Sequence, residues 1–293
     1  MGATRFLQMA ATTSAVCLNC GAALTGAYCA RCGQKATSSD LTLAGFLHET
    51  THELTHWDGK VPATLKALFF KPGLLTADFL AGRRARWLTP LRVYLICSVA
   101  LFGGRALIEE TGLRTTREMA GVSFTRRDTT GPLTPEEREL YERSPLARIF
   151  GVDRVERATR DSKRFNREFE AALPKAMFIL LPVFALLTNL AWRKSHPRYP
   201  AHLYVALHIH AAVFSAFLIL SIVVGLIPSR TIAALAGLSF AGYVVWYGLV
   251  AFHRVFRDSW PKTVVKALAV GIAYDLCLFV VLFGFLVYAV LRM

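Results

Sequence analysis

The chain has 293 residues, of which 54% are apolar, and it carries a formal net charge of +14. This apolar share is high for a soluble protein and, with a mean hydropathy of +0.40, argues against a soluble globular domain. The positive charge would suit nucleic-acid binding if it formed one patch. The basic residues instead gather in alternate connections between apolar segments, which is typical of membrane topology, so we expect no nucleic-acid partner.

The first segment, residues 1–16, has a single arginine and no sustained apolar run, so we expect a mobile, retained tail and not a signal peptide. Residues 17–36 follow, and they contain two C-x2-C pairs separated by eight residues. The four cysteines are Cys17, Cys20, Cys29 and Cys32. Four thiolates arranged in this way close a tetrahedron around one structural Zn²⁺, which defines a zinc ribbon.

Two details of this segment support zinc. Gly21 and Gly33 each follow the second cysteine of a pair and can adopt the positive φ that such turns need. The segment is too small for a hydrophobic core, so bound metal would supply most of its folding free energy. Two disulfides are the alternative, and a reducing cytosol disfavours them.

The stretch "HETTHELTH", residues 48–56, holds two overlapping H-E-x-x-H signatures of zinc proteases. A helix is expected over 41–57, and its three histidines lie opposite the apolar stripe. The first and third would be about 12 Å apart along the axis, so the three cannot bind one ion. We expect a polar or partner-facing surface, with metal binding or a metalloprotease as alternatives. The residues concerned are His48, His52 and His56.

Residues 40–88 form an amphipathic segment before the membrane domain. In its second half, short apolar runs alternate with basic residues, and Pro72-Gly73 interrupts the helix, so neither part is long enough to span a bilayer. This half could lie in the cytosolic headgroup region, with Trp87 at the interface. It could equally pack against the cytosolic end of the helical bundle.

Five apolar stretches within 89–293 are long enough for helices that cross a bilayer of about 30 Å, which takes roughly 20 residues. They lie near 89–108, 171–192, 202–227, 231–253 and 263–291. The first is the weakest, because Arg105 lies inside it and has to reach an interface. We therefore predict an all-α integral membrane protein with about five transmembrane helices and a small N-terminal cytosolic zinc ribbon.

The connections between these helices predict the topology. The insertion 109–170 carries 13 basic and 13 acidic residues, whereas 193–198 and 254–266 carry an excess of Lys and Arg. The positive-inside rule places the N-terminus in the cytosol, and the insertion and the C-terminus outside. We expect the insertion to form a solvated helical cap with disorder around 112–132, and the protein to lie in a bacterial cytoplasmic (inner) membrane.

Ionisable residues inside the bundle are the remaining candidates for a site, because such groups are expensive in hydrocarbon and usually face the interior. They are His202, His208, His210, His253 and Asp275. We expect Asp275 to face inward near His208, His210 or Tyr243. These residues could form a proton- or metal-handling pocket, or each could make a structural hydrogen bond or lie at an interface.

Four stretches together resemble a known family. They are "YCARCGQ" (28–34), "TLKALFFKPG" (64–73), "GRRARWLTPLRVY" (82–94) and "HLYVALHIHA" (202–211). The chain is similar in them to an uncharacterised bacterial membrane-protein family, catalogued as domain of unknown function 3667. The resemblance runs from Cys17 into the third span and implies a zinc ribbon followed by a multi-span helical domain, without an activity.

The sequence favours a membrane-anchored interaction or scaffold protein with structural Zn²⁺. Its expected partners are the lipid bilayer and a cytosolic protein bound through the N-terminal segment. A small-ion or metal transporter that uses Asp275 and the buried histidines is the alternative, and an H-E-x-x-H membrane protease is a distant third. We do not expect an enzyme.

Overall fold

The computed structural model of the chain describes residues 16–36, 59–110, 135–143, 145–160, 162–227 and 229–292. Within these ranges the regular structure is helical, apart from two isolated antiparallel β-bridges, Val16 with Ala23 and Tyr28 with Lys35. The helices are α2 (Val61–Phe70), α3 (Leu74–Leu80), α4 (Pro90–Glu110), α6 (Pro135–Arg143), α7 (Pro145–Phe150), α8 (Val152–Arg160), α9 (Ser162–Trp192), α10 (Tyr199–Leu226), α11 (Arg230–Phe256) and α12 (Trp260–Leu291). The all-α prediction is confirmed for the described part of the chain.

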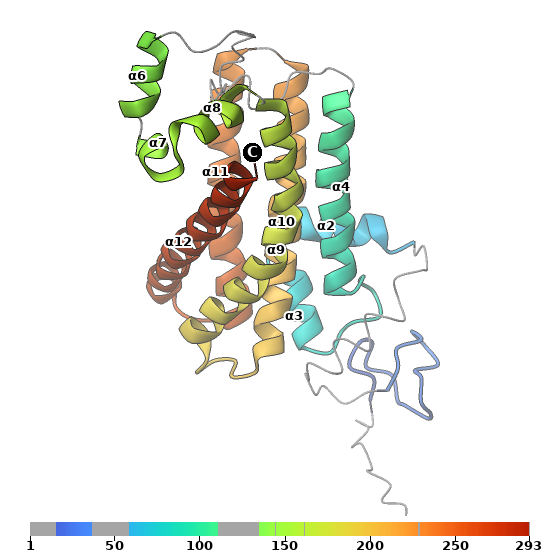
Figure 1. The fold of residues 1–293 in the computed structure, drawn as a ribbon. Helices are drawn as coiled ribbons and strands as arrows, with labels where there is room; N and C mark the ends of the chain where they lie inside the picture. Colours follow the sequence, from blue (N-terminus) through green and yellow to red (C-terminus); the bar gives the residue numbers. More distant parts are fainter. Residues whose placement is uncertain are drawn as a thin grey trace, which may run out of the picture.

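In the part of the chain that the structure describes, four segments are long and apolar enough to cross a membrane. They are Ala171–Trp192 of α9, and α10, α11 and α12 over their full lengths. α4 runs beside α10, and its apolar part, Pro90–Gly104, is shorter than these four (Figure 1). The long helices alternate in direction, so the α9–α10 and α11–α12 connections lie at the same end as the cysteine module, residues 17–36 (Figure 1). We call this the module end of the bundle.

α10 is the central helix of the bundle. Residues 200–208 are all buried, because α4, α9, α11 and α3 surround this part of α10. At the module end, Trp192 of α9 stacks on Phe252 and Phe256 of α11, with ring centroids 4.8 and 4.6 Å away. α12 packs mainly against α9 and leaves most of its own surface outward.

Particular residues of the sequence explain where the long helices begin and end. Pro200 and Pro261 stand in the first turn of α10 and α12, where a missing N–H does no harm. Ser229 caps α11 by accepting a hydrogen bond from the Ile232 N–H at 3.4 Å. At the far end of α11, Arg257 adopts a left-handed conformation with φ 55° and turns the chain into α12.

The pair of short helices α2 and α3 is part of the core. Leu68, Leu75 and Phe79 are each at most 2% exposed and pack in the same cluster as α10 and α11. Gly73 joins the two helices with φ +73°, and a Cβ atom there would lie 2.9 Å from the Ala251 backbone of α11. Of the two alternatives for this segment, the structure shows packing against the bundle.

The helical cap consists of α6, α7 and α8 at the end opposite the module (Figure 1). Pro135 is the first residue of α6, and Arg143 pairs with Glu139 at 2.6 Å one turn earlier. Phe150 of α7 packs on Ala289 at the end of α12. Several expectations concern parts outside the described residues: the tail up to residue 15, the region 112–132, and the helix 41–57 with His48, His52 and His56.

Candidate metal centre

The cysteine module consists of two turns with the same hydrogen bonds. In each, the first cysteine donates its N–H to the carbonyl five residues later, and the glycine after the second cysteine donates back to the first cysteine. The bonds are Cys17 to Ala22 (2.8 Å), Cys29 to Gln34 (2.8 Å), Gly21 to Cys17 (2.8 Å) and Gly33 to Cys29 (2.9 Å). Gly21 and Gly33 have φ of 74° and 72°, which confirms the predicted need for glycine.

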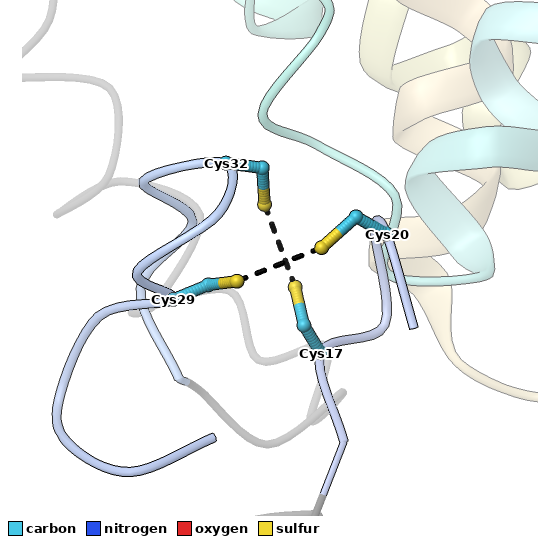
Figure 2. A group of neighbouring side chains, drawn as sticks. All are labelled: Cys17, Cys20, Cys29 and Cys32. Carbon is cyan, nitrogen blue, oxygen red and sulfur yellow. Dashed lines mark hydrogen bonds between the residues drawn. The ribbon is translucent and has the colours of Figure 1, made fainter. Parts of the chain in front are cut away.

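These turns bring the four sulfur atoms to one point, as Figure 2 shows. The Sγ atoms all lie within 4.8 Å of one another, with Cys17 to Cys32 at 3.6 Å and Cys20 to Cys29 at 3.5 Å. In each close pair one cysteine comes from each turn, so both turns are needed to assemble the four sulfur atoms. Within the described residues this is the one cluster of His, Cys, Asp or Glu side chains that could hold a metal ion.

Backbone N–H groups favour the thiolate forms that a metal needs. The N–H of Gln34 hydrogen-bonds to the Cys32 sulfur and lowers the pKa of Cys32 to about 6. The N–H of Cys32 acts in the same way on Cys29 and lowers the pKa of that thiol. In Cys20 the hydrogen bond from the Ala22 backbone also lowers the pKa, but burial and hydrogen bonds with the three other cysteines raise it to about 11. Cys29 and Cys32 are therefore the two thiols that favour the form bound by a cation with a preference for soft sulfur ligands.

Gln34 fixes the module to the bundle. Its side-chain Nε2 donates to the Gly82 carbonyl at 2.8 Å, and its Oε1 accepts from the N–H groups of Arg84 and Ala85, both at 3.0 Å. Leu18 packs beside the same loop, so closely that a Cβ atom on Gly82 would lie 2.6 Å from it. The module thus rests on the connector between α3 and α4, residues 81–89.

The connector is itself held by a buried carboxylate. Asp78 of α3 is 3% exposed and accepts from the Arg83 guanidinium, with the shorter contact at 2.6 Å. The Trp87 indole N–H donates to the other oxygen of Asp78 at 2.7 Å. Arg86 lies over the Trp87 ring, 4.3 Å from its centroid. The module, the connector and the α2–α3 pair are therefore one connected unit.

The five polar residues predicted inside the bundle are not brought together. His208 and His210 lie two residues apart on α10, which separates them by about 200° around the helix. His208 meets Thr76 of α3 at 2.9 Å, whereas His210 meets the hydroxyl of Tyr274 in α12 at 2.7 Å. Because His210 Nδ1 faces the Ala206 carbonyl at 2.8 Å, that nitrogen carries the proton and Nε2 accepts from Tyr274.

The two other histidines lie near the module end. His202 donates from Nε2 to the His196 carbonyl at 2.8 Å, and its ring stacks on Phe256. His253 stacks on Trp260, with ring centroids 4.0 Å apart. Both contacts join the ends of neighbouring helices, as the structural alternative expected.

Asp275 contradicts the sequence-based expectation. Its side chain is exposed on the outer surface of α12, and the adjacent Tyr274 occupies the inward position instead. Tyr243, expected as its possible partner, donates to the Phe69 carbonyl at 3.3 Å. The prediction that Asp275 faces the bundle interior is wrong, because α12 is rotated by one residue, about 100°, from the expected orientation.

Sequence reasoning missed three residues that organise this end of the molecule: Gln34, Thr76 and Asp78. Asp78 left a recognisable signal, since it is the one acid in a basic stretch that ends in Trp87. Gln34 directly follows the second Cys-Gly pair, but nothing in the sequence identifies its acceptor and donors 48 to 51 residues away.

A family model described as Protein of unknown function (DUF3667) matches residues 58–102. The match supports the resemblance to that family and covers α2, α3, the connector and the first part of α4. It includes two of the four stretches that suggested the family, 64–73 and 82–94, and neither the cysteine module nor α10. No curated protein and no solved structure matches the chain.

Proposed function

We propose that the protein is a membrane-anchored interaction or scaffold protein. In this proposal a zinc ribbon, residues 17–36, is presented at the cytosolic end of a five-helix bundle in a bacterial cytoplasmic membrane. The partner is a cytosolic protein that binds the exposed side of the ribbon. No catalytic step is assigned to the chain.

Zinc is supported by the spacing of the sulfur atoms. Tetrahedral Zn²⁺ with Zn–S bonds of about 2.3 Å separates its ligand atoms by about 3.8 Å. The two close pairs, at 3.5 and 3.6 Å, are near this value. Four thiolates leave no open position for a water molecule, so the ion is structural and Lewis-acid chemistry is not part of the proposal.

The topology is supported by charge and by helix length. Basic residues of the two module-end connections, such as Arg193, Lys194 and Arg257, indicate the cytosolic side. α4 has 21 residues and extends about 31 Å, of which its apolar part, Pro90–Gly104, accounts for about 22 Å. The proposed fifth crossing therefore places Arg105 and the residues after it at the opposite interface. Five crossings from a cytosolic N-terminus leave the C-terminus outside.

The observation that carries the proposal is the rigid attachment of the module through Gln34. A ribbon on a flexible tether would need no such joint, whereas a docking surface benefits from a fixed orientation because less conformational entropy is lost on binding. Tyr28 of the module is 62% exposed, and Val16, which directly precedes the module, is 50% exposed. An exposed aromatic residue on a rigid support is the usual form of a binding anchor.

The test is photo-crosslinking in cells from a photoreactive residue placed at position 28. We expect a discrete protein adduct that disappears when Cys17→Ser removes the metal. Tyr288, which is 50% exposed at the other end of the molecule, provides the matched control position. Adducts that are equal at positions 28 and 288, or that persist in Cys17→Ser, would refute the proposal.

A further inference from the structure

The outward face of α12 has the spacing of a helix-pairing surface. Five of its exposed residues recur at intervals of three and four: Val265, Leu268, Ile272, Asp275 and Phe279. We call these five residues the α12 seam. A 3-4 repeat keeps one side of a helix facing a partner helix over several turns, and a polar residue at one such position fixes the register.

Asp275 distinguishes this face from an ordinary lipid-facing surface. It is the only acidic residue in the four candidate spans, and it lies 15 residues after Trp260 and 16 before Leu291, at the middle of α12. Among the side chains that the structure describes, none forms a hydrogen bond or ion pair with it. A carboxyl group at mid-bilayer is costly unless another polar group meets it there.

We propose that the α12 seam is an interface between two copies of this chain, in which the two Asp275 carboxyl groups hydrogen-bond to each other. Copies inserted in the same membrane share one orientation, so a two-fold axis along the membrane normal makes the two α12 helices parallel. Such an axis keeps every residue at its own depth, and Asp275 therefore meets Asp275 of the second copy.

The chemistry of the carboxyl group suits this arrangement. A protonated carboxyl both donates and accepts, and an ionised one accepts, so two copies that share at least one proton complement each other. The two helices meet through apolar side chains on either side of the acid, with Ile272 and Phe279 one turn away in each direction. Hydrogen bonds between helices in a membrane stabilise such pairs.

Association can be measured on the full chain co-expressed with two different tags, by co-purification and by counting photobleaching steps in dilute lipid vesicles. Asp275→Leu should weaken association about tenfold, which corresponds to about 1.4 kcal/mol. Asp275→Asn should retain it, because an amide also donates and accepts. Denaturant unfolding in detergent micelles reports that each variant folds.

The apolar part of the seam has a matched control. Ile272 of α12 and Leu238 of α11 are both 71% exposed. Ile272→Ala should weaken association, whereas Leu238→Ala should leave it unchanged, since lipid covers that residue in either state.

Three outcomes would overturn the proposal. Equal association of wild type and Asp275→Leu would mean that the acid does not join two copies. Loss of association in Asp275→Asn as well as in Asp275→Leu would indicate a cationic partner on another protein. Loss of association in Lys175→Leu would indicate that Asp275 pairs with this exposed lysine of α9 and not with Asp275 of the second copy.

Discussion

In the cysteine module, sulfur atoms from residues up to 15 positions apart lie within 4.8 Å of one another. In α10, His208 and His210 are two positions apart and contact different helices. The difference arises from what sets the direction of each side chain. Two short turns with glycines aim the cysteines inward through local backbone geometry. A long helix sends neighbouring residues to opposite sides, and only the packing of the whole bundle decides what each one meets.

This contrast predicts how strongly the residues of each region depend on one another. Ligands of one metal act as a unit, so the loss of any one removes most of the binding energy. Residues that face different helices act independently, and their effects on stability add. The following changes test the contrast, beginning with the largest expected effect.

Removal of one cysteine should abolish the metal centre. Binding of structural Zn²⁺ to such modules contributes about 10–16 kcal/mol at neutral pH, so Cys17→Ser should empty the site and unfold residues 17–36. The double variant Cys17→Ser, Cys29→Ser should lose nothing further. Metal analysis of the purified protein measures this, with Cys97→Ser, a buried cysteine outside the cluster, as the control. About one Zn²⁺ retained in Cys17→Ser would show that the four thiolates do not act together.

Replacement of Asp78 should destabilise the bundle more than replacement of Asp258. Both acids accept from a Trp indole and from a basic side chain, but Asp78 is 4% exposed at the side chain and Asp258 is 20% exposed. Asp78→Ala leaves the Trp87 N–H buried without its acceptor and should cost about 2–3 kcal/mol. Asp258→Ala should cost about 1 kcal/mol, because water can replace the carboxylate. Denaturant unfolding in detergent micelles compares the two variants. Equal losses of unfolding free energy would contradict the deeper burial of Asp78.

Gly73→Ala should destabilise the contact between the α2–α3 pair and α11. The positive φ of 73° is strained for alanine, and its Cβ would lie 2.9 Å from the Ala251 backbone, so we expect a loss of about 1–3 kcal/mol. Gly103 is the matched control, since it lies in α4 with nothing within 4 Å of an added Cβ. Gly103→Ala should be neutral or stabilising by up to about 1 kcal/mol. Thermal unfolding in micelles distinguishes the two variants. A Gly73→Ala variant as stable as the wild type would mean that the α2–α3 pair does not pack closely against Ala251 of α11.

These examples show which features could be predicted from the sequence. The turns around Gly21 and Gly33, the cysteine cluster and the long apolar helices depend on interactions within a few residues or on length and composition. The orientation of Asp275 could not be predicted in this way. Tyr274 and Asp275 are adjacent polar residues on α12, and Tyr274 is the one that turns inward, where it contacts His210 of α10 and Phe184 of α9.

The connection between the module and the bundle also depends on long-range contacts. Gln34 finds its partners about 50 residues later, in a loop whose shape Asp78 fixes from α3. No periodicity or local motif encodes a contact of this kind. The prediction of an N-terminal docking segment therefore did not include this joint, although the predicted bounds of 17–36 enclose the cluster.

Gln34→Ala should separate the module from the connector without loss of metal. The change removes three hydrogen bonds at a partly buried joint, which we expect to lower stability by about 1–2 kcal/mol. Protease cleavage of the connector, residues 81–89, should become faster while the metal content stays the same. Lys35→Ala, one residue further on, is the control. Unchanged cleavage in Gln34→Ala would mean that other contacts hold the module in place.

The smallest expected effect is the coupling between His208 and His210. Since His208 meets Thr76 of α3 and His210 meets Tyr274 of α12, the two share no partner in these contacts, and the losses in His208→Ala and His210→Ala should add to within about 0.5 kcal/mol. The same cycle with His210→Ala and Tyr274→Phe should show coupling of about 1 kcal/mol, because these side chains share one hydrogen bond. Unfolding of the single and double variants in micelles measures both cycles. Coupling between the histidines as large as that between His210 and Tyr274 would mean that they act on one pocket, which would favour the transport hypothesis for this part of the bundle.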